Sequence, residues 1–167
     1  MDSHLVVYRS KSGNIDRIKD FISWGKTGRV EGWSATKSFK PGDLVFFYFG
    51  SPAKSIIALG KVESEPYTEQ GPFDWTKKTK TTSCDFNPVW LLDNPIPLSQ
   101  FINDPVIAKW YEGRPYRRAH KIPQKVASGL LRKVVAENPK VKNNVMKSGI
   151  LKPTDETAAA EAAEEGI

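Results

Sequence analysis

The stretch that most restricts the fold runs from Lys40 to Val62, KPGDLVFFYFGSPAKSIIALGKV. Leu44–Phe49 is a run of six apolar and aromatic residues, too short for a typical globular helix and rich in residues that favour strands. Ser55–Glu63 is a second apolar run, and Gly60 inside it indicates a bulge or a close backbone approach. A Pro-Gly-Asp turn precedes the first run. We therefore predict a hairpin within a curved sheet or barrel, with Leu44–Phe49 buried on both faces.

The composition indicates one domain with one sizeable core, because the chain has 167 residues of which 39% are hydrophobic. The longest apolar run is far shorter than the roughly 20 residues of a membrane-spanning helix. The N-terminus also lacks the features of a signal peptide, so we expect a cytoplasmic protein. The single cysteine, Cys84, excludes an internal disulfide, and the only histidines, His4 and His120, cannot form a metal cluster alone. We expect no metal site.

The charge is uneven along the chain. The net charge is +6, but Pro153–Ile167 holds five acids and no base, so residues 1–152 carry 25 basic against 14 acidic residues. We interpret 1–152 as the folded domain and 153–167 as an acidic Ala/Glu tail or linker. A domain this basic favours an anionic partner, with nucleic acid ahead of a membrane because no basic amphipathic helix is evident. Charge alone does not distinguish such a partner from an excess of basic residues that only keeps the protein soluble.

The first part of the chain predicts a strand at His4–Tyr8, a loop, and a short helix that begins after Asn14 as N-cap. Residues 23–34 contain three glycines and two tryptophans, which is typical of a loop. A tryptophan in such a loop either covers the core or forms a wall of a binding pocket, and the residues favour neither. Residues 65–88 predict a long polar loop, with Cys84 inside it beside Asp85, whose charge would raise the thiol pKa.

The second part predicts a strand at Val89–Leu92 and a short helix that starts at Asp104-Pro105 and ends at Gly113. A basic loop, Arg114–Lys121, then leads into a last helix whose apolar residues face the core. Residues 140–151 predict a weakly structured basic segment, either a strand or a packing arm.

The loops combine aromatic side chains with clustered cations. Flat aromatic walls stack on an unpaired base, and cations bind the flanking phosphates. By contrast, the sequence contains no phosphate-binding glycine loop with its lysine, no zinc-deaminase pattern and no Gly-x-Ser-x-Gly elbow. His120 lies among cations, a neighbourhood that suits phosphate contact better than general-base catalysis.

The order of these features resembles the PUA-like superfamily, and within it the YTH and EVE domains. The resemblance covers about residues 3–138 and includes HLVVYRSKSGNI, PGDLVFFYFG with IIALGKVES, PFDW, FNPVWLLDNPIP and RPYRRAHKIPQKV. It implies an α+β fold with a small, strongly curved mixed β-barrel flanked by short helices. It also implies a pocket for one modified base, N6-methyladenine in RNA for YTH domains and modified bases in DNA for EVE domains, with no cofactor.

The resemblance also implies site residues. Trp24 matches the first cage tryptophan of YTH domains and Trp75 the later one, whereas Trp33 is similar to an aromatic residue that EVE sequences place before the Pro-Gly-Asp turn. The expected base pocket comprises Trp24, Trp33, Trp75, Tyr8, Arg9, Ser23 and Gly25, and the expected phosphate contacts are Arg114, Arg117, Arg118, His120, Lys121, Lys77 and Lys78.

The resulting hypothesis is a non-catalytic reader of a flipped or unpaired methylated base. DNA is favoured over RNA, and a separate nuclease or motor would be the partner that such a reader targets. A YTH-like reader of RNA is the first alternative. An enzyme with an unrecognised site and a module that binds a peptide with its tryptophan loops are the others.

Overall fold

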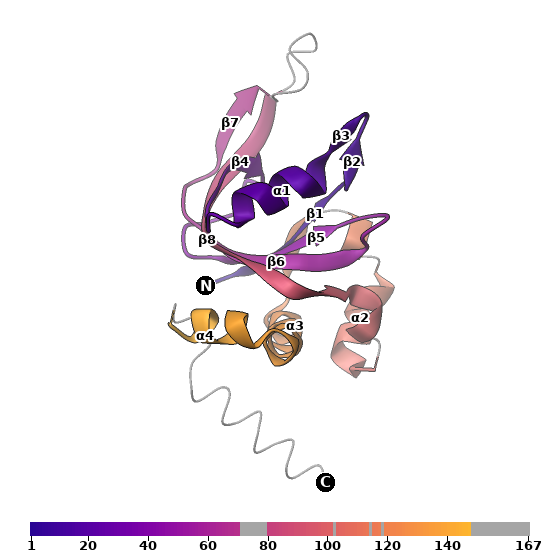
Figure 1. The fold of residues 1–167 in the computed structure, drawn as a ribbon. Helices are drawn as coiled ribbons and strands as arrows, with labels where there is room; N and C mark the ends of the chain where they lie inside the picture. Colours follow the sequence, from indigo (N-terminus) through magenta and orange to yellow (C-terminus); the bar gives the residue numbers. More distant parts are fainter. Residues whose placement is uncertain (71–79, 102, 114, 118, 148–167) are drawn as a thin grey trace.

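The computed structural model describes residues 1–70, 80–101, 103–113, 115–117 and 119–147 (Figure 1). The elements follow one another as β1 (Ser3–Tyr8), β2 (Lys11–Ser12), β3 (Ile15–Asp16), α1 (Arg17–Gly25), β4 (Val30–Ser34), β5 (Leu44–Phe49), β6 (Ser55–Val62), β7 (Tyr67–Gln70), β8 (Lys80–Pro97), the 3-10 turn η1 (Leu98–Phe101), α2 (Pro105–Glu112), the 3-10 turn η2 (Pro115–Arg117), β9 (His120–Ile122), α3 (Gln124–Glu137) and α4 (Pro139–Lys147).

One curled, seven-stranded sheet forms the centre of the molecule. Its strands lie in the order β4-β8-β6-β5-β1-β9, and β7 pairs with β8. β1 and β5 are parallel, whereas the other pairs are antiparallel, so the sheet is mixed. The sheet curls far enough for Tyr8 at the end of β1 to donate a hydrogen bond of 2.6 Å from its Oη to the carbonyl oxygen of Ser34 at the end of β4.

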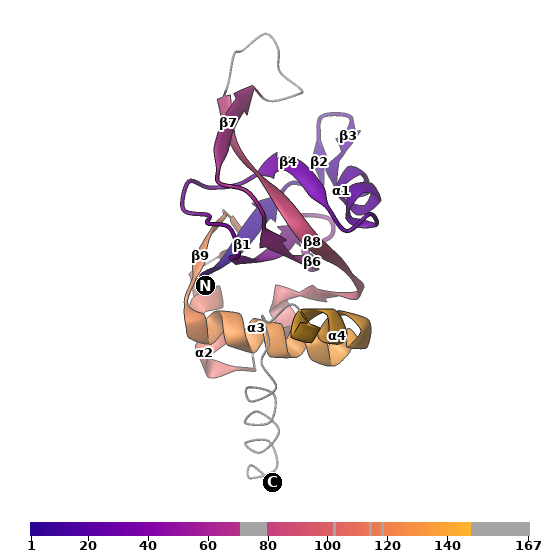
Figure 2. The same cartoon turned by 90° about the vertical axis from the view of Figure 1, so that its left-hand side faces the viewer.

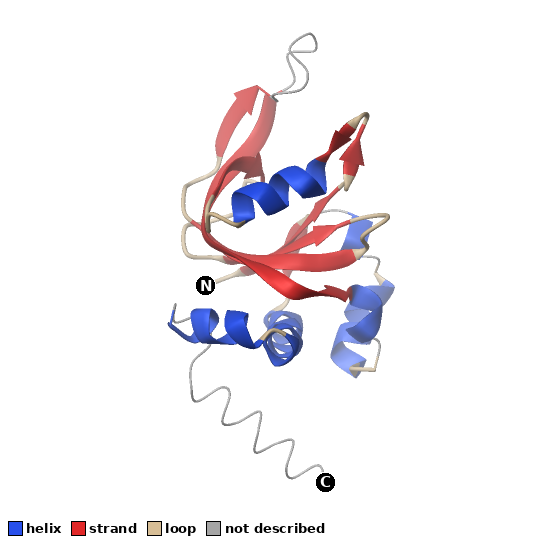
Figure 3. Ribbon diagram, viewed as in Figure 1, coloured by secondary structure: helices blue, strands red, loops and turns tan. Residues whose placement is uncertain are grey.

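Helices cover both faces of this sheet. α1 lies on one face, and α2, α3 and α4 lie on the other (Figures 2 and 3). The expected α+β fold, a small curved barrel flanked by short helices, is therefore confirmed. Within the described part of the chain, no helix has both the length and the hydrophobicity needed to cross a membrane.

The predicted central hairpin is confirmed. All six residues of β5 are buried, and β5 pairs with β6 in antiparallel register. A Cβ placed on Gly60 would lie only 2.8 Å from Cε2 of Phe47, and the pairing of β6 with β8 shifts register just after Gly60. Gly60 therefore marks both a close approach and an irregularity of the sheet.

The Pro-Gly-Asp turn is fixed by one buried carboxylate. Gly42 has φ +92°, a conformation that glycine adopts without strain. Asp43 Oδ2 accepts hydrogen bonds from the Lys40 amide at 3.1 Å and pairs with His4 Nε2 at 2.8 Å. Its other oxygen accepts from the Asp2 amide at 3.2 Å. The turn is thus tied to the start of β1.

Alternation along β5 divides the core into two clusters. Phe46 and Tyr48 point to the cluster under α2, α3 and α4, whereas Phe47 and Phe49 point to the cluster under α1. Successive side chains of a strand point to opposite faces, so a continuous apolar strand supplies both clusters. The cluster under α1 also contains Trp33, and this places the aromatic residues of interest at that face.

Two predictions for residues 13–34 were wrong. Helix α1 begins at Arg17 with Asp16 as its N-cap, because Gly13 at φ +62° turns a small β2–β3 hairpin that holds Asn14 outside the helix. Residues 23–34 are not a single loop: α1 continues through Gly25 and β4 starts at Val30.

Three later predictions were also wrong. Residues 65–88 contain the β7–β8 pair, in which Tyr67–Gln70 aligns with Lys80–Ser83, and β-branched threonines in this region favour strands. Cys84 accordingly lies in β8 and is fully buried, not in a polar loop. Residues 140–147 form α4, because Val141 and Val145 are one turn apart and both are buried. The short helix after Asp104, α2, and the helix after the basic segment, α3, are as predicted, although α3 is followed by α4 and is not the last helix.

Candidate functional site

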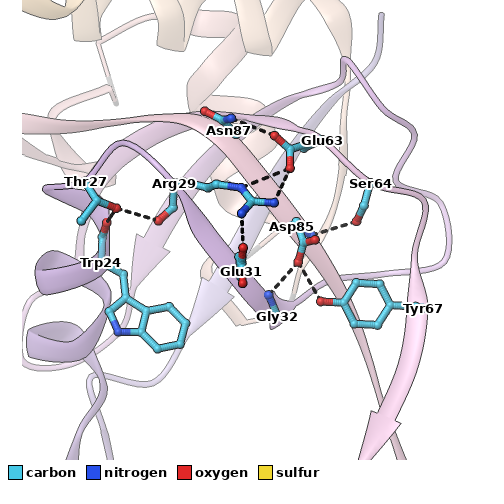
Figure 4. A network of polar contacts seen from close by, with 10 residues as sticks. All are labelled: Trp24, Thr27, Arg29, Glu31, Gly32, Glu63, Ser64, Tyr67, Asp85 and Asn87. Carbon is cyan, nitrogen blue, oxygen red and sulfur yellow. Dashed lines mark hydrogen bonds and ion pairs between the residues drawn. The ribbon is translucent and has the colours of Figure 1, made fainter.

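Trp24 is an exposed tryptophan at the end of α1. Its side chain is 47% exposed. The next residue, Gly25, is buried, and a Cβ placed on it would lie 2.7 Å from Cδ2 of Leu91. The absence of a side chain at Gly25 therefore lets the end of α1 pack closely against β8. The hydroxyl of Thr27 donates to the carbonyl oxygen of Trp24 at 2.7 Å and secures the final turn (Figure 4).

Trp33 stands behind Trp24 and is almost fully buried, with 5% of its surface exposed. The two ring centroids are 6.1 Å apart in an edge-on arrangement. Phe21 also contacts Trp33 with a centroid distance of 5.4 Å, and the Arg17 guanidinium lies 4.7 Å above the indole. This packing gives Trp24 a rigid backing.

An open cleft of about 440 Å³ lies beside Trp24, between the end of α1 and the start of β4. The volume falls within the range of roughly 300–1,000 Å³ that is usual for small-molecule sites. Among the described residues, those that line the cleft are Ser23, Trp24, Thr27, Arg29 and Glu31. Thr27, Arg29 and Glu31 were not predicted from the sequence.

Arg29 connects the cleft to a polar network. Its Nη2 donates to Glu63 Oε1 at 2.7 Å and its Nη1 donates to Glu31, while Glu63 Oε2 accepts from Asn87 Nδ2 at 2.8 Å (Figure 4). The hydrogen bond from Arg29 is the main cause that lowers the pKa of Glu63, and the same bond raises the pKa of Arg29. Two carboxylates thus share one guanidinium, and of the two only Glu31 is among the described residues that line the cleft.

Asp85 fixes the strand that carries Glu31 and Trp33. Asp85 Oδ1 accepts from the Gly32 amide at 2.9 Å and from the Tyr67 hydroxyl at 2.7 Å. Gly32 has φ +61° and sits where the pairing of β4 with β8 shifts register. This bulge lets Trp33 turn into the core while Glu31 stays exposed at the cleft.

Of the other residues expected at the base pocket, the structure describes Tyr8 and Arg9. Tyr8 is buried, and burial is the main cause that raises its pKa well above 10. Arg9 is exposed directly after β1. Trp75 lies outside the described residues. Of the expected pocket residues, Ser23 and Trp24 line the cleft. Gly25 packs against Leu91 of β8, and Trp33 contacts the ring of Trp24.

The residues expected to contact phosphate are only partly described. His120 and Lys121 lie on the edge strand β9 and pair with Leu5 and His4. Lys121 Nζ is 3.3 Å from Asp2 Oδ1, and the ring of His120 lies 6.0 Å from that of Trp110. Arg117 is described only in its backbone, at the end of η2. Lys77, Lys78, Arg114 and Arg118 lie outside the described residues, so the phosphate contacts stay a prediction.

Burial raises the pKa of the Cys84 thiol from 9.0 to about 11, and the neighbouring Asp85 carboxylate adds to the effect. The thiol is therefore neutral near pH 7 and is a poor nucleophile. Among the residues that the structure describes, no group of three or more histidine, cysteine, aspartate or glutamate side chains could hold a metal ion.

A search of protein families adds a decisive observation, since residues 17–132 match the EVE domain. The chain belongs to the EVE domain family. The resemblance to PUA-like domains is thereby confirmed. EVE and other PUA-like domains are generally binding modules and not catalysts. A search of curated protein sequences gave no match.

Solved structures share the fold of this EVE domain at low sequence identity. One is human THYN1 in complex with DNA that contains 5-methylcytosine (16% identity, 79% of this chain and 96% of that chain, TM-score 0.58). Another is a hypothetical protein from Leishmania major (14%, 80% and 94%, 0.59). A third is Atu2648 from Agrobacterium tumefaciens (16%, 80% and 92%, 0.54).

Proposed function

We propose that this EVE domain is a non-catalytic reader that accepts a modified base of DNA, flipped or unpaired, in the cleft beside Trp24. The observation that carries the proposal is the half-exposed indole of Trp24 on the wall of an open cleft of about 440 Å³. It is supported by the membership of the EVE family and by the complex of human THYN1 with DNA containing 5-methylcytosine.

The physical basis is stacking on a rigid aromatic wall. A base stacked on an aromatic side chain gains roughly 1–3 kcal/mol, and a buried methyl group adds about 0.8 kcal/mol. The edge-on contact with Trp33 restricts the Trp24 ring, so ordering this side chain on binding costs less conformational entropy. A flipped base costs a few kcal/mol of unstacking, which phosphate contacts must help to offset.

The pairing of Arg29 bears on where phosphate would bind. Its guanidinium is already hydrogen-bonded to Glu31 and Glu63, so the cation at the cleft is poorly placed to bind a phosphate. The phosphates would instead meet the basic surface elsewhere, including the segment from 114 to 121. A separate nuclease or motor protein is the partner that this reader would direct to modified DNA.

A binding panel tests the proposal. Otherwise identical oligonucleotides would carry 5-methylcytosine, 5-hydroxymethylcytosine, N4-methylcytosine, N6-methyladenine or no modification, each in single-stranded DNA, duplex DNA and RNA. We expect one modified base in DNA to bind about ten-fold more tightly than its unmodified parent. Equal binding across the panel would remove the reader function, and tightest binding to RNA with N6-methyladenine would favour the YTH-like alternative.

Two controls separate the remaining alternatives. Incubation of methylated plasmid with the protein and Mg²⁺ should leave the DNA intact, whereas cleavage or loss of the methyl group would demonstrate an enzyme. Affinity should fall steeply as salt rises, as expected for phosphate contacts. Affinity for a peptide with little salt dependence would instead indicate a protein-interaction module.

A further inference from the structure

One carboxylate of the described residues, that of Glu31, lines the cleft. Glu31 lines the cleft together with Trp24, and its side chain is 61% exposed. In Figure 4 Glu31 lies beside the Arg29 guanidinium, in the strand β4 that continues through Gly32. A base stacked against Trp24 would therefore present its polar edge within reach of Glu31.

The network fixes Glu31 as a hydrogen-bond acceptor. Arg29 donates to Oε1 of Glu31, and among the described residues none donates to its second oxygen. The hydroxyl of Thr27 is directed to the carbonyl oxygens of Trp24 and Arg29, at 2.7 and 3.2 Å, so its proton is already used. At this wall Glu31 therefore offers an acceptor, whereas the Thr27 hydroxyl has no free proton to donate.

We propose that Glu31 is a specificity-determining residue, whose carboxylate accepts a hydrogen bond from the exocyclic amino group of the bound base and rejects a base that has a carbonyl there. This inference rests on the proposed reader function. Carboxylates accept from the N4 amino group of cytosine, whereas thymine presents the O4 acceptor at the same position. A 5-methylcytosine and a thymine carry the same methyl group, so Glu31 would distinguish a methylated cytosine from its deamination product.

The competing explanation is that the Arg29 network only braces the fold, and the structure supplies a matched control for it. Glu63 pairs with the same guanidinium through Nη2 and Nε, at 2.7 and 3.2 Å. Glu63 is not among the described residues that line the cleft. Glu31→Gln and Glu63→Gln therefore remove the same charge from the same network, but only the first changes the wall of the cleft.

The experiment measures affinity for duplexes that carry one test base opposite an abasic site, so that no test base has a pairing partner to lose. The test bases are 5-methylcytosine, thymine and 5-methyl-2-pyrimidinone, which lacks both the amino group and O4. For the wild type we expect 5-methylcytosine to bind roughly 10- to 100-fold more tightly than thymine, with 5-methyl-2-pyrimidinone between them. Glu31→Gln should bring the three within about three-fold, because an amide can either donate or accept.

The outcomes separate this inference from the reader function. Equal binding of 5-methylcytosine and thymine by the wild type, or a preference that survives in Glu31→Gln, would overturn the role of Glu31. Loss of the preference in Glu63→Gln to the same extent would assign it to the network as a whole and would also overturn the inference. Failure of the wild type to prefer 5-methylcytosine over its unmodified parent in the oligonucleotide panel of the proposed function would instead refute the reader specificity for this base.

Discussion

Replacement of Trp24 by alanine should separate binding from stability. Trp24 is 47% exposed, so in the folded state it buries about half of the roughly 200 Å² that a fully buried large aromatic residue would bury. The alanine variant loses this burial. At about 25 cal/mol per Å², this burial is worth about 2.5 kcal/mol as an upper estimate. The higher helix propensity of alanine returns about 0.5 kcal/mol. We therefore expect a loss of at most about 2 kcal/mol in the free energy of unfolding.

Trp33→Ala provides the comparison because Trp33 is only 5% exposed and packs against Tyr8 and Phe21. Deletion of a buried tryptophan costs about 3–5 kcal/mol. Urea unfolding followed by far-ultraviolet circular dichroism measures both variants. Fluorescence anisotropy with an oligonucleotide that contains 5-methylcytosine should show Trp24→Ala binding roughly 5- to 150-fold more weakly, which corresponds to one lost stack. Unchanged affinity, or a stability loss as large as that of Trp33→Ala, would refute the assignment of Trp24 to the binding wall.

Four further predictions concern the rest of the chain. Stability should fall as pH rises from 9 towards 11, because the unfolded Cys84 thiol ionises near 9.0 and the folded one at about 11; Cys84→Ala should flatten this part of a plot of unfolding free energy against pH. Gly60→Ala should destabilise the protein by about 1–3 kcal/mol in urea unfolding, since the new Cβ would meet Phe47, and an unchanged midpoint would contradict the close approach. Asp85→Ala should release the Gly32 bulge and weaken both stability and DNA binding, and full binding with reduced stability would separate the bulge from the site. Arg117→Ala combined with Arg118→Ala should lower affinity equally for modified and unmodified DNA and make the slope of log affinity against log salt shallower by about one to two units; an unchanged slope would remove these arginines from the phosphate contacts.

The sequence alone was sufficient where local signals were strong. The run Leu44–Phe49 admits only a strand buried on both faces, and Asp104-Pro105 with Gly113 defines both ends of α2. Trp24 and Ser23 were placed at a pocket from the resemblance to YTH and EVE domains, and both line the cleft. Their contact with a base stays a prediction.

Tertiary contacts explain what the sequence could not show. The β2–β3 hairpin at Gly13 places the start of α1 later than predicted. The bulge at Gly32 allows part of the glycine-rich segment to form the strand β4. Arg29, Glu31 and Glu63 are spread over two segments, so their network is visible only after β4 and β6 are positioned. The one local signal for Glu31 was the Glu-Gly-Trp sequence, in which a glycine bulge can place a charged and an aromatic residue on different sides of a strand.

The most direct test of the central claim is nuclear magnetic resonance of the five indole N–H groups, each assigned by a single tryptophan-to-phenylalanine variant. The protein would be titrated with single-stranded DNA that contains one 5-methylcytosine, and with the same strand carrying cytosine. We predict that the Trp24 resonance shifts most and that its apparent Kd is about ten-fold lower for the modified strand. The ring of Trp110 lies 6.0 Å from that of His120, an expected phosphate contact, so its resonance should respond equally to both strands. Shifts at Trp110 with an unaltered Trp24, or the same Kd for both strands, would contradict this prediction.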